Sequence, residues 1–412
     1  MTADPDLIAD LVLRRFRELP AKRKPQVRDN GPHEWVPLSA IVAEEDDVLT
    51  CISLATGMKC LPAAKLPQAQ GNALHDWHAE VLAIRAFNRH LLDECLRAGE
   101  AATSSSSSSP RPLLLRRRSP HECSSTPQPF AIRDGVKLHM YCSEAPCGDA
   151  SMELTMAAQD DASPWAVPSG ADKEEDSSPA AALPGRAYFS QLGVVRRKPA
   201  RGDAPPTISK SCSDKLALRQ CTSLLSSVTA LLVHPGNAYL STLILPASQR
   251  SVSGCERAFS ARGRMKGLDG RVWDGGYAFT PFEVRTTERE FEFSRREAAK
   301  AGKVAASNLA AAWTASGVEE GSMGGVLQGR RAFDPRGASA MARRRMWEVA
   351  VAVAEDVGDE ALLDALRAGT YAEVKQGPML AARRAVKEDA RREALAGWVA
   401  NVGDDGFGLL KQ

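Results

Sequence analysis

The chain has 412 residues, of which 43% are hydrophobic and 25% are charged, which is typical of a soluble globular protein. Its formal net charge of +2 excludes a nucleic-acid binder that is basic on every side, although it allows one local basic face. No apolar run approaches the roughly 20 residues of a membrane helix, and residues 1–6 are too acidic for a secretory signal. The nine cysteines are odd in number and scattered, which indicates reduced thiols in the cytosol or nucleus.

The first predicted elements are a helix and a pair of strands. Apolar residues recur at helical spacing over residues 7–16, and Pro20 is expected to end this helix. Residues 35–43 and 48–54 are typical of two strands, and the acidic stretch between them is predicted to be a turn.

Two stretches, residues 101–129 and 160–185, are predicted to be disordered insertions. The first contains a serine run and several prolines, and the second is acidic. Neither holds enough apolar residues to offset the entropy that is lost on ordering. The three arginines at 116–118 favour a solvated loop over an RNA-binding or targeting patch.

Further strands are predicted over residues 136–142, 229–233 and 239–245, and the C-terminal third, from about Ser339, has helical spacing. The insertions interrupt a continuous pattern of strands and helices. We therefore expect residues 1–412 to form one domain rather than the two or three that length alone suggests. The expected fold class is α/β, with a central mixed sheet and a helical C-terminal part.

The most informative segment contains His78 and Glu80, at the beginning of a predicted helix. A neutral imidazole in this place can bind zinc, and a carboxylate two residues later lies close to the metal without having to ligate it. A histidine and a glutamate at this spacing are common by chance. Taken alone, they are better interpreted as structural residues.

Two cysteines are predicted at the N-termini of other helices. Cys147 follows a strand, in a turn punctuated by Pro146 and Gly148, and Cys212 follows a polar turn that begins at Ser209. The positive end of a helix dipole lowers the pKa of a thiol and so favours the thiolate that a metal needs. Taken alone, Cys147 is equally well interpreted as a small buried residue, and for Cys212 that interpretation is the better one.

Together, one histidine and two cysteines make a three-ligand metal site. Zinc with three protein ligands keeps a fourth position for water, as in catalytic sites, whereas structural sites are closed by four ligands. Zinc lowers the pKa of this water towards about 7, and Glu80 is expected to pass the water's proton to a leaving amine. The usual zinc deaminases have a second cysteine three residues after the first, where this chain has Ala150. The second thiolate is therefore assigned to the distant Cys212.

These three segments closely resemble the motifs of the adenosine deaminases that act on RNA. The matching residues are His-Ala-Glu at 78–80, Pro-Cys-Gly-Asp-Ala at 146–150 and Ser-Cys-Ser-Asp-Lys at 211–215. The resemblance covers most of the chain outside the two insertions. It implies a cytidine-deaminase-like α/β/α core, zinc bound by His78, Cys147 and Cys212, and Glu80 as the proton shuttle in the conversion of adenosine to inosine.

Within this family, the chain most resembles the branch that acts on tRNA. Only 77 residues precede His78, and the domain's own helix and strands account for them, so we expect no module for double-stranded RNA there. The resemblance implies deamination 3′ to the anticodon of eukaryotic alanine tRNA, in the cytoplasm and/or nucleus, with no membrane and no obligate protein partner. The alternatives are a deaminase of another structured or double-stranded RNA, a silent RNA-binding subunit and a structural zinc protein. Retention of Glu80 argues against the silent subunit.

The resemblance also implies inositol hexakisphosphate enclosed in the core. Asp76 and Lys215 would form a hydrogen-bond relay between this anion and the metal site. Burying several cations is costly unless an anion compensates them, which makes such a site physically reasonable. The positions that match the family's phosphate contacts are Arg85, Lys215, Ser227, Tyr371, Lys375 and Trp398.

The sequence does not decide which other basic residues contribute to this phosphate site. The chain departs from its duplex-editing relatives at residues 218–219 and 400–401, which predicts a changed set of contacts. Either Arg343 or Arg344 could point inward. Arg383 and Arg384, in contrast, are predicted to lie on a solvated helix face.

A basic loop before Cys212 is predicted to contact RNA. Phosphate contacts from such a loop would position RNA without reading its sequence, although a solvated loop is an equally good interpretation. By resemblance, Lys59 is a further contact near the adenosine pocket. Asp203 aligns with a residue that fills the space of the flipped base in duplex-editing relatives. The loop residues concerned are Arg196, Arg197, Lys198, Arg201 and Asp203.

Overall fold

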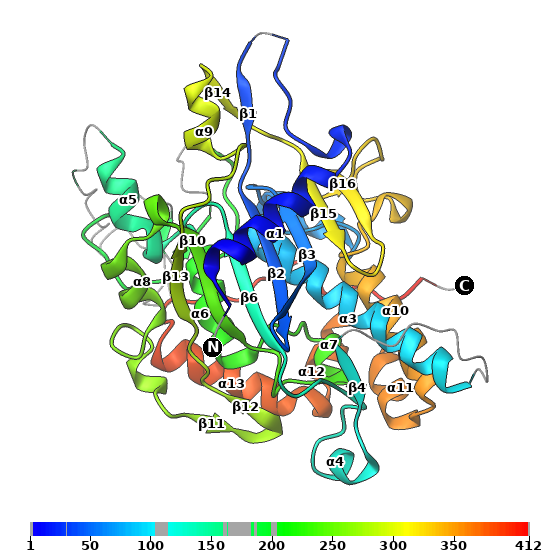
Figure 1. The fold of residues 1–412 in the computed structure, drawn as a ribbon. Coiled ribbons are helices and arrows are strands. Elements are labelled where there is room, and N and C mark those ends of the chain that lie inside the picture. Colours follow the sequence, from blue (N-terminus) through cyan, green and yellow to red (C-terminus); the bar gives the residue numbers. More distant parts are fainter. Residues whose placement is uncertain are drawn as a thin grey trace, which may run out of the picture.

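The computed structural model describes residues 3–29, 31–103, 114–159, 163, 183–184, 188–198 and 204–410. Figure 1 shows a twisted central sheet with helices on both of its faces. Among the described residues, eight strands form this sheet, in the order β13-β10-β6-β2-β3-β15-β16-β17. Their bounds are Leu38–Glu45 (β2), Val48–Thr56 (β3), Lys137–Cys142 (β6), Leu240–Pro246 (β10), Glu283–Thr287 (β13), Ala310–Thr314 (β15), Glu319–Met323 (β16) and Val326–Leu327 (β17).

The sheet is mixed. β6, β10 and β13 run parallel to one another, whereas β2, β3, β15, β16 and β17 each pair antiparallel with their neighbours, and β2 is antiparallel to β6. The predicted strands at residues 48–54, 136–142 and 239–245 are confirmed as β3, β6 and β10. The strand expected over residues 35–43 begins later, at Leu38, because residues 33–35 form the separate short strand β1.

Alternation along the strands places one hydrophobic layer on each face of the sheet. Val42 and Tyr141 pack with α1 (Pro5–Glu18), which crosses one face. Ile41 and Met140 belong to the larger core on the other face, which also contains the buried side of α3 (Ala79–Thr103). The helix predicted over residues 7–16 is therefore confirmed, and it forms the outer layer of an α/β/α arrangement.

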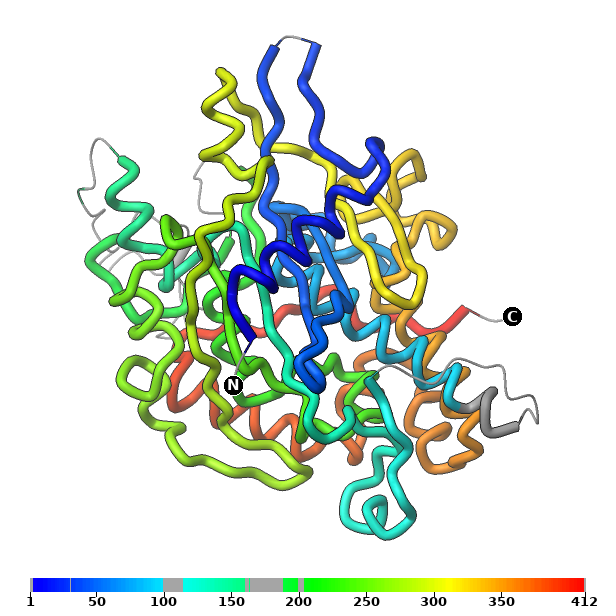
Figure 2. The backbone as a smooth tube through the Cα atoms, in the orientation of Figure 1, coloured from blue at the N-terminus to red at the C-terminus, as the bar shows by residue number. Residues whose placement is uncertain are grey.

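The C-terminal third is helical, as the sequence predicts. The last stretch of the chain then crosses behind the central strands, where Figure 2 draws it in red. In this stretch Asp404 accepts the backbone N–H of Gly71 at 2.8 Å and lies 2.5 Å from the Nε2 atom of His75. The helices of this third are α10 (Arg343–Val357), α11 (Glu360–Leu366), α12 (Tyr371–Gln376) and α13 (Ala381–Glu393).

Smaller elements surround the sheet. Among the described residues, no helix is both apolar enough and long enough to span a membrane. The remaining helices are α2 (Leu66–Ala69), α4 (Pro120–Ser125), α5 (Met152–Ala157), α6 (Cys212–Thr222), α7 (Thr229–Leu232), α8 (Val252–Phe259) and α9 (Arg295–Lys300). The remaining strands are β1 (His33–Trp35), β4 (Leu115–Arg117), β5 (Phe130–Ile132), β7 (Leu183–Pro184), β8 (Arg196–Arg197), β9 (Val233–His234), β11 (Val272–Trp273), β12 (Tyr277–Ala278) and β14 (Val304–Ala306).

The disorder predicted for residues 101–129 is wrong for much of that stretch. α3 continues to Thr103, β4 pairs with β5, and α4 lies between them. Leu114 and Leu115 are buried, and the carboxylate of Glu94 on α3 accepts both of their backbone N–H groups at 3.1 Å. The burial of these two leucines offsets entropy that is lost when the stretch becomes ordered, which its serines and prolines do not do. Residues 104–113 lie outside the described residues.

The arginines of this stretch hold its fold rather than forming a freely solvated loop. Arg116 binds the carboxylate of Glu122 through two hydrogen bonds, at 2.8 and 3.1 Å. Arg118 donates to the carbonyl oxygens of Thr126 and Gln128, each at 2.7 Å. The second predicted insertion, 160–185, lies outside the described residues except at 163 and 183–184.

The strand predicted over residues 229–233 is also wrong. Residues 229–232 form the helical turn α7, and only Val233 enters a short strand, β9. The turn is set by Ser226, whose carbonyl accepts the N–H of Ala230 at 2.9 Å and whose hydroxyl lies 2.8 Å from that of Thr229. Because every residue of α7 is buried, its apolar run shows no periodicity that would distinguish a helix from a strand.

Candidate active site

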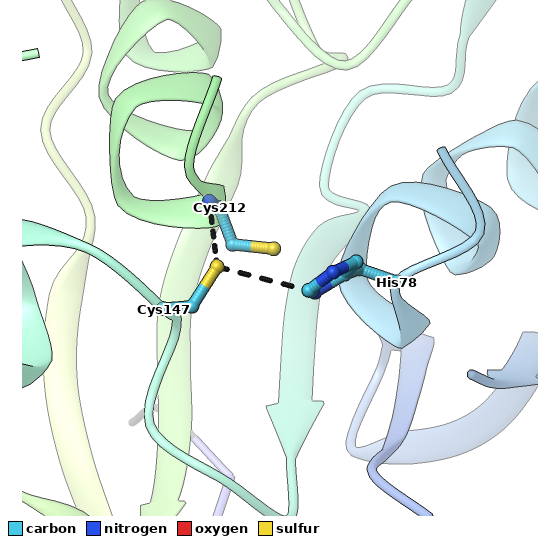
Figure 3. A group of neighbouring side chains, drawn as sticks. All are labelled: His78, Cys147 and Cys212. Carbon is cyan, nitrogen blue, oxygen red and sulfur yellow. Dashed lines mark hydrogen bonds between the residues drawn. The ribbon is translucent and has the colours of Figure 1, made fainter. Parts of the chain in front are cut away.

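Three side chains from separate segments converge on one point (Figure 3). The donor atoms of His78, Cys147 and Cys212 all lie within 4.8 Å of one another. The Sγ atom of Cys147 lies 3.9 Å from Nδ1 of His78 and accepts the backbone N–H of Cys212 at 3.3 Å. The structure thus brings together the three residues that the sequence singled out as metal ligands. A second group of possible donors, Cys60, Asp76 and His78, shares the same histidine.

Each of the three residues is placed by the beginning of a helical segment. His78 immediately precedes α3, and its backbone N–H donates to the Asp76 carboxylate at 3.0 Å. Cys212 is the first residue of α6, where the Ser211 hydroxyl accepts the backbone N–H of Asp214 as a helix cap. Cys147 lies just before the 3-10 turn Asp149–Ser151, which leads into α5. Their position at helix starts follows the sequence-based expectation and favours thiolates. Burial and the hydrogen bond with Cys147 nevertheless raise the pKa of Cys212 well above its usual range, so Cys147 is the thiol that ionises first.

The ionisation of this cluster suits a bound cation. The pKa of the Cys147 thiol lies well below its usual range, because of its hydrogen bond with Cys212 and the positive charges of Lys198 and His78. Burial opposes protonation of His78, but the negative charges of Asp76 and Cys147 raise its pKa to about 10. A thiolate therefore faces a proton-bearing imidazole. A divalent metal would displace that proton, because thiolate and neutral imidazole are the forms that bind metals.

Glu80 lies in the first turn of α3, beside the cluster, and only 5% of it is exposed. Burial raises the pKa of its carboxyl group, and the negative charge of Cys147 raises it further. A carboxyl group whose pKa has moved towards neutral both accepts and releases a proton readily near pH 7, which suits general acid–base catalysis.

Asp76 connects the cluster with its surroundings. The Oδ2 atom of Asp76 accepts hydrogen bonds from Nζ of Lys198 at 2.8 Å, from the Ser209 hydroxyl at 2.6 Å, and from Nζ of Lys215. Lys198 also donates to the Sγ atom of Cys212, at 3.2 Å. A continuous hydrogen-bonded path therefore runs from Lys215 through Asp76 and Lys198 to a cysteine of the cluster. Sequence reasoning included Asp76 and Lys215 in this path but missed Lys198 and Ser209.

The expected exposed basic loop is wrong for two of its residues. Only 2% of Arg196 and 5% of Lys198 are exposed, because β8 folds back against the start of α6. The Arg196 side chain donates to the carbonyl of Tyr188 at 2.9 Å. Neither side chain can contact RNA in this position. Nothing in the local sequence distinguishes a buried lysine in this basic, proline-rich stretch from an exposed one.

The remaining expected RNA contacts have different outcomes. Arg197 is half-buried in β8, whereas Arg201 and Asp203 lie outside the described residues. Lys59 is half-buried and donates a hydrogen bond to the side chain of Asn308. Its carbonyl accepts the backbone N–H of Trp77 at 3.0 Å, which places Lys59 beside the segment that leads to His78.

A cavity of about 560 Å³ extends from Asp76 to the C-terminal helices. All six positions predicted to contact phosphate line its wall: Arg85, Lys215, Ser227, Tyr371, Lys375 and Trp398. Ten lysine and arginine side chains line the cavity, against three aspartates and glutamates, so its positive charge is not balanced by the protein. The ten cationic residues are Arg85, Lys210, Lys215, Arg219, Arg343, Lys375, Arg383, Arg384, Lys387 and Arg391.

The cationic wall shows the effect of this imbalance. Burial and the charges of Lys215 and Arg391 lower the pKa of Lys210 to about 7. Burial and the charges of Arg383 and Arg85 lower the pKa of Arg219 to about 9. Buried nitrogen atoms of His75, Arg383 and Arg391 also have no hydrogen-bond partner among the described residues. A polyanion would satisfy these donors and restore the ordinary pKa values, so the cavity fits such a ligand.

The solvated face predicted for Arg383 and Arg384 is wrong. Only 3% of Arg383 is exposed, and its guanidinium donates to the carbonyl oxygens of Thr222 and Leu225. Arg384 donates to the carbonyl of Lys375 at 2.9 Å and also lines the cavity. A signal was present in the sequence, because residues 383, 386 and 390 share one buried side of α13 at helical spacing.

Of Arg343 and Arg344, which the sequence could not distinguish, Arg343 is the one that lines the cavity. Its side chain lines the cavity, whereas the guanidinium of Arg344 donates to the carbonyl of Gln70 and to the side chain of Asn72. The two departures from the duplex-editing pattern, at 218–219 and 400–401, both lie at the cavity wall. Arg219 and Asn401 are therefore candidates for the changed contacts that the sequence predicts.

Comparisons with known proteins agree with this geometry. The mixed sheet with helices on both of its faces is that of the cytidine-deaminase-like class of enzymes. Residues 53–402 match the adenosine-deaminase (editase) domain, and the chain belongs to this family of enzymes that deaminate adenosine.

The chain is also similar to individual members of the family. The tRNA-specific adenosine deaminase 1 of Schizosaccharomyces pombe is 33% identical over 407 residues, which cover 97% of this chain and 96% of that protein. The tRNA-specific adenosine deaminase 1 of Saccharomyces cerevisiae is 32% identical over 244 residues, or 58% of each chain. The mouse protein of the same name is 27% identical over 237 residues, which cover 54% of this chain and 45% of that protein.

Proposed function

We propose that this protein hydrolyses adenosine to inosine in tRNA, with zinc held by His78, Cys147 and Cys212. The observation that carries the proposal is the convergence of three donor atoms within 4.8 Å, beside the buried carboxyl group of Glu80. The substrate class is supported by the similarity to tRNA-specific deaminases along almost the whole chain.

The donor set fits zinc better than other common metals. Two thiolates and one imidazole are soft and borderline ligands, which favour zinc over magnesium or calcium. Three protein ligands are the number found in catalytic zinc sites. Zinc in such a site lowers the pKa of a water molecule towards about 7 and so supplies the nucleophile at neutral pH.

Glu80 moves the protons of the reaction. Its carboxylate takes a proton from the attacking water and delivers it to the ring nitrogen next to C6 of the adenine. It then assists protonation of the amino group, which leaves as ammonia when its bond to C6 breaks. Adenosine and water are thereby converted to inosine and ammonia. The raised pKa of Glu80 lets one carboxyl group serve as base and then as acid.

The proposed target is the adenosine 3′ to the anticodon of alanine tRNA. A base must leave its stack to reach a buried catalytic group, and this costs least where the RNA is already single-stranded, as in an anticodon loop. Lys59 and Arg197 are proposed to contact the RNA backbone near the site. Such contacts position the loop without reading its sequence.

We further propose that the cationic cavity encloses inositol hexakisphosphate. Six phosphate groups match a wall in which cationic side chains outnumber acidic ones by ten to three. The proposed contacts include Arg343, Arg219 and Arg383 besides the six positions expected from the sequence. Lys215 would connect the anion through Asp76 to the metal site, because it lines the cavity and donates to that carboxylate.

The proposal is tested by incubating the purified protein with total tRNA and sequencing the tRNA for inosine. We expect inosine next to the anticodon of alanine tRNA and none with the Cys212→Ser variant, which lacks one donor. Inosine that is unaffected by Cys212→Ser would contradict the site, and inosine in a different RNA would contradict the substrate. Metal and phosphate analysis of the denatured protein tests the two bound species.

A further inference from the structure

The two cysteine turns carry the same second feature, a buried aspartate two residues after the cysteine. Asp149 follows Cys147 and Asp214 follows Cys212, and both aspartates are completely buried. A buried carboxylate is costly unless it is paired and fully hydrogen-bonded. The partners of these two aspartates therefore fix where the two turns lie.

Both partners come from one short unit, residues 252–264, which comprises α8 and the turn that follows it and which we call the α8 clamp. The Nε atom of Arg257 donates to the carboxylate of Asp149 at 3.1 and 3.2 Å. Arg257 also donates to the backbone carbonyl of Asp149, at 2.8 Å. Arg264 donates to the carboxylate of Asp214 at 2.6 Å, and only 4% of its side chain is exposed.

The α8 clamp is closed by a hydrogen bond within it and fits closely against the turn that follows Cys147. The backbone N–H of Arg264 donates to the carbonyl of Arg257 at 2.9 Å, so the two arginines share one base. A Cβ atom at Gly263 would lie 2.3 Å from the carbonyl oxygen of Arg257, and one at Gly254 would lie 2.7 Å from that of Ala150. Glycine at 254 thus allows the clamp to lie close to the turn that follows Cys147, whereas glycine at 263 allows the clamp's own turn to fold against Arg257.

The same aspartates also hold the loop that carries Lys198. Asp149 accepts the backbone N–H of Gly193 at 2.8 Å, and Asp214 accepts that of Arg196 at 2.9 Å. Lys198 in turn donates to the Sγ atom of Cys212. Each aspartate thus joins the clamp, a cysteine turn and this loop, so loss of either arginine would loosen all three.

We propose that the α8 clamp holds the two cysteine turns at metal-binding separation, with Arg257 and Arg264 as positioning residues. The inference deepens the proposed function and rests on its metal site. Neither arginine is placed among the metal donors or in the cavity wall. Arg264 acts through Asp214, and Arg257 acts through Asp149 and also through Glu153 of α5, which accepts hydrogen bonds from it at 2.5 and 3.1 Å. Groups hydrogen-bonded directly to a metal ligand typically change metal affinity 10- to 100-fold when they are replaced, and we take the same range for these arginines, which fix the turns that carry the ligands.

The test measures metal retention in the full-length protein without RNA. Wild type and the variants Arg257→Met and Arg264→Met are loaded with zinc, and the rate of zinc transfer to a colorimetric chelator is followed where circular dichroism shows every protein folded. We expect transfer about 10 to 100 times faster in both variants. With cobalt in place of zinc, the thiolate-to-cobalt absorption per bound ion should also weaken, because the sulfur geometry is less fixed.

Arg262→Met is the matched control, since Arg262 belongs to the same turn but 82% of its side chain is exposed and it pairs with Glu256 of the same unit. This control should lose zinc at the wild-type rate, and Arg264→Lys should recover part of the retention because it keeps the charge. Wild-type zinc loss in folded Arg257→Met and Arg264→Met would overturn the proposal, as would equally fast loss in the control.

Variants that fail to fold and a wild type that binds no metal would also bear on the proposal. If the methionine variants do not fold, Arg257→Lys and Arg264→Lys replace them, and wild-type retention in both would overturn the clamp. A wild-type protein that takes up no zinc or cobalt would overturn the clamp together with the proposed function. A wild type that binds metal and deaminates, with variants that retain metal normally, would overturn the clamp alone.

Discussion

The donor cluster and the cationic cavity both border Asp76, yet they balance their charges differently. In the cluster, Asp76 faces Lys198 and Lys215, and the Cys147 thiolate faces His78, so each charge has a partner within the protein. In the cavity, ten cationic side chains face three acidic ones. The protein alone therefore nearly balances the charges of the first site, whereas it leaves the second site with an excess of positive charge.

The largest effect is expected from the loss of the Glu80 carboxyl group, which should slow deamination without changing what the protein binds. Replacing Glu80 by Gln removes the proton carrier but keeps the shape and volume of the side chain. Deamination of tRNA should slow about 10²- to 10⁴-fold, the usual contribution of a general acid–base group. Zinc and phosphate content, measured on the same preparation, should match wild type. Turnover close to that of wild type would contradict the role of Glu80.

The next largest effect is expected from a substitution in the wall of the cavity. Arg383→Met leaves the carbonyl oxygen of Thr222 without its donor, whereas that of Leu225 keeps its hydrogen bond from Arg219. Because one unsatisfied buried acceptor costs about 1–3 kcal/mol, we expect the free energy of unfolding to fall by about that amount and the retained phosphate to decrease. Arg392→Met, in the same helix but exposed, should change stability by no more than about 0.5 kcal/mol. Equal effects of the two variants in denaturant titrations would refute a specific role for Arg383.

A pH titration tests the charge imbalance directly. Burial, together with the charges of Arg383 and Arg219, lowers the pKa of Lys387 well below its usual 10.5. Between the two pKa values the unfolded chain binds more protons than the folded one, so stability without the anion should rise as the pH increases towards 10.5. The anion favours the charged lysine and should remove this slope.

The measurement is the unfolding temperature as a function of pH, with and without added inositol hexakisphosphate. Lys387→Met should flatten the slope of the anion-free protein, because the titrating group is gone. A slope that is the same with and without the anion would show that the cavity does not bind it.

The smallest effect lies away from both sites. The Ser119 hydroxyl caps α4 by accepting the N–H of Glu122, whose carboxylate accepts the N–H of Ser119 in return. Ser119→Ala should destabilise this turn by about 1 kcal/mol and speed hydrogen exchange over residues 119–126. Metal content, phosphate content and turnover should stay at wild-type values. A change in any of these would mean that this region is coupled to the two sites.

The placing of the three donors at helix starts could be predicted from local signals in the sequence, whereas their joint role required the three motifs to be taken together. His78, Cys147 and Cys212 all lie at helix starts, and caps, turns and nearby polar residues announce such positions. The sheet could be predicted equally well where strands alternate, as in β6. The 229–232 segment could not, because its side chains are buried all round and a helix then leaves the same apolar run as a strand.

The cavity depends on residues whose neighbours are far away in sequence. Arg383 is buried because Thr222 and Leu225 offer carbonyl oxygens to it, more than 150 positions earlier in the chain. Lys198 is buried because Asp76 and Cys212 receive it from two other segments. Helical spacing alone places Arg383 on the buried side of α13 but does not show which carbonyl oxygens it meets, and no local pattern marks Lys198 as buried. Sequence reasoning therefore placed both in solvent or on RNA.

The contact between His75 and Asp404 joins residues far apart in the sequence, which affects how this region forms during synthesis of the protein. His75 and Asp404 are 329 positions apart, and the ribosome needs on the order of half a minute to make that length. For that time the nascent chain carries His75 with its C-terminal partner still missing. The wall of the cationic cavity can be completed only after translation is almost finished, because Trp398, Asn401 and Asp405 line it.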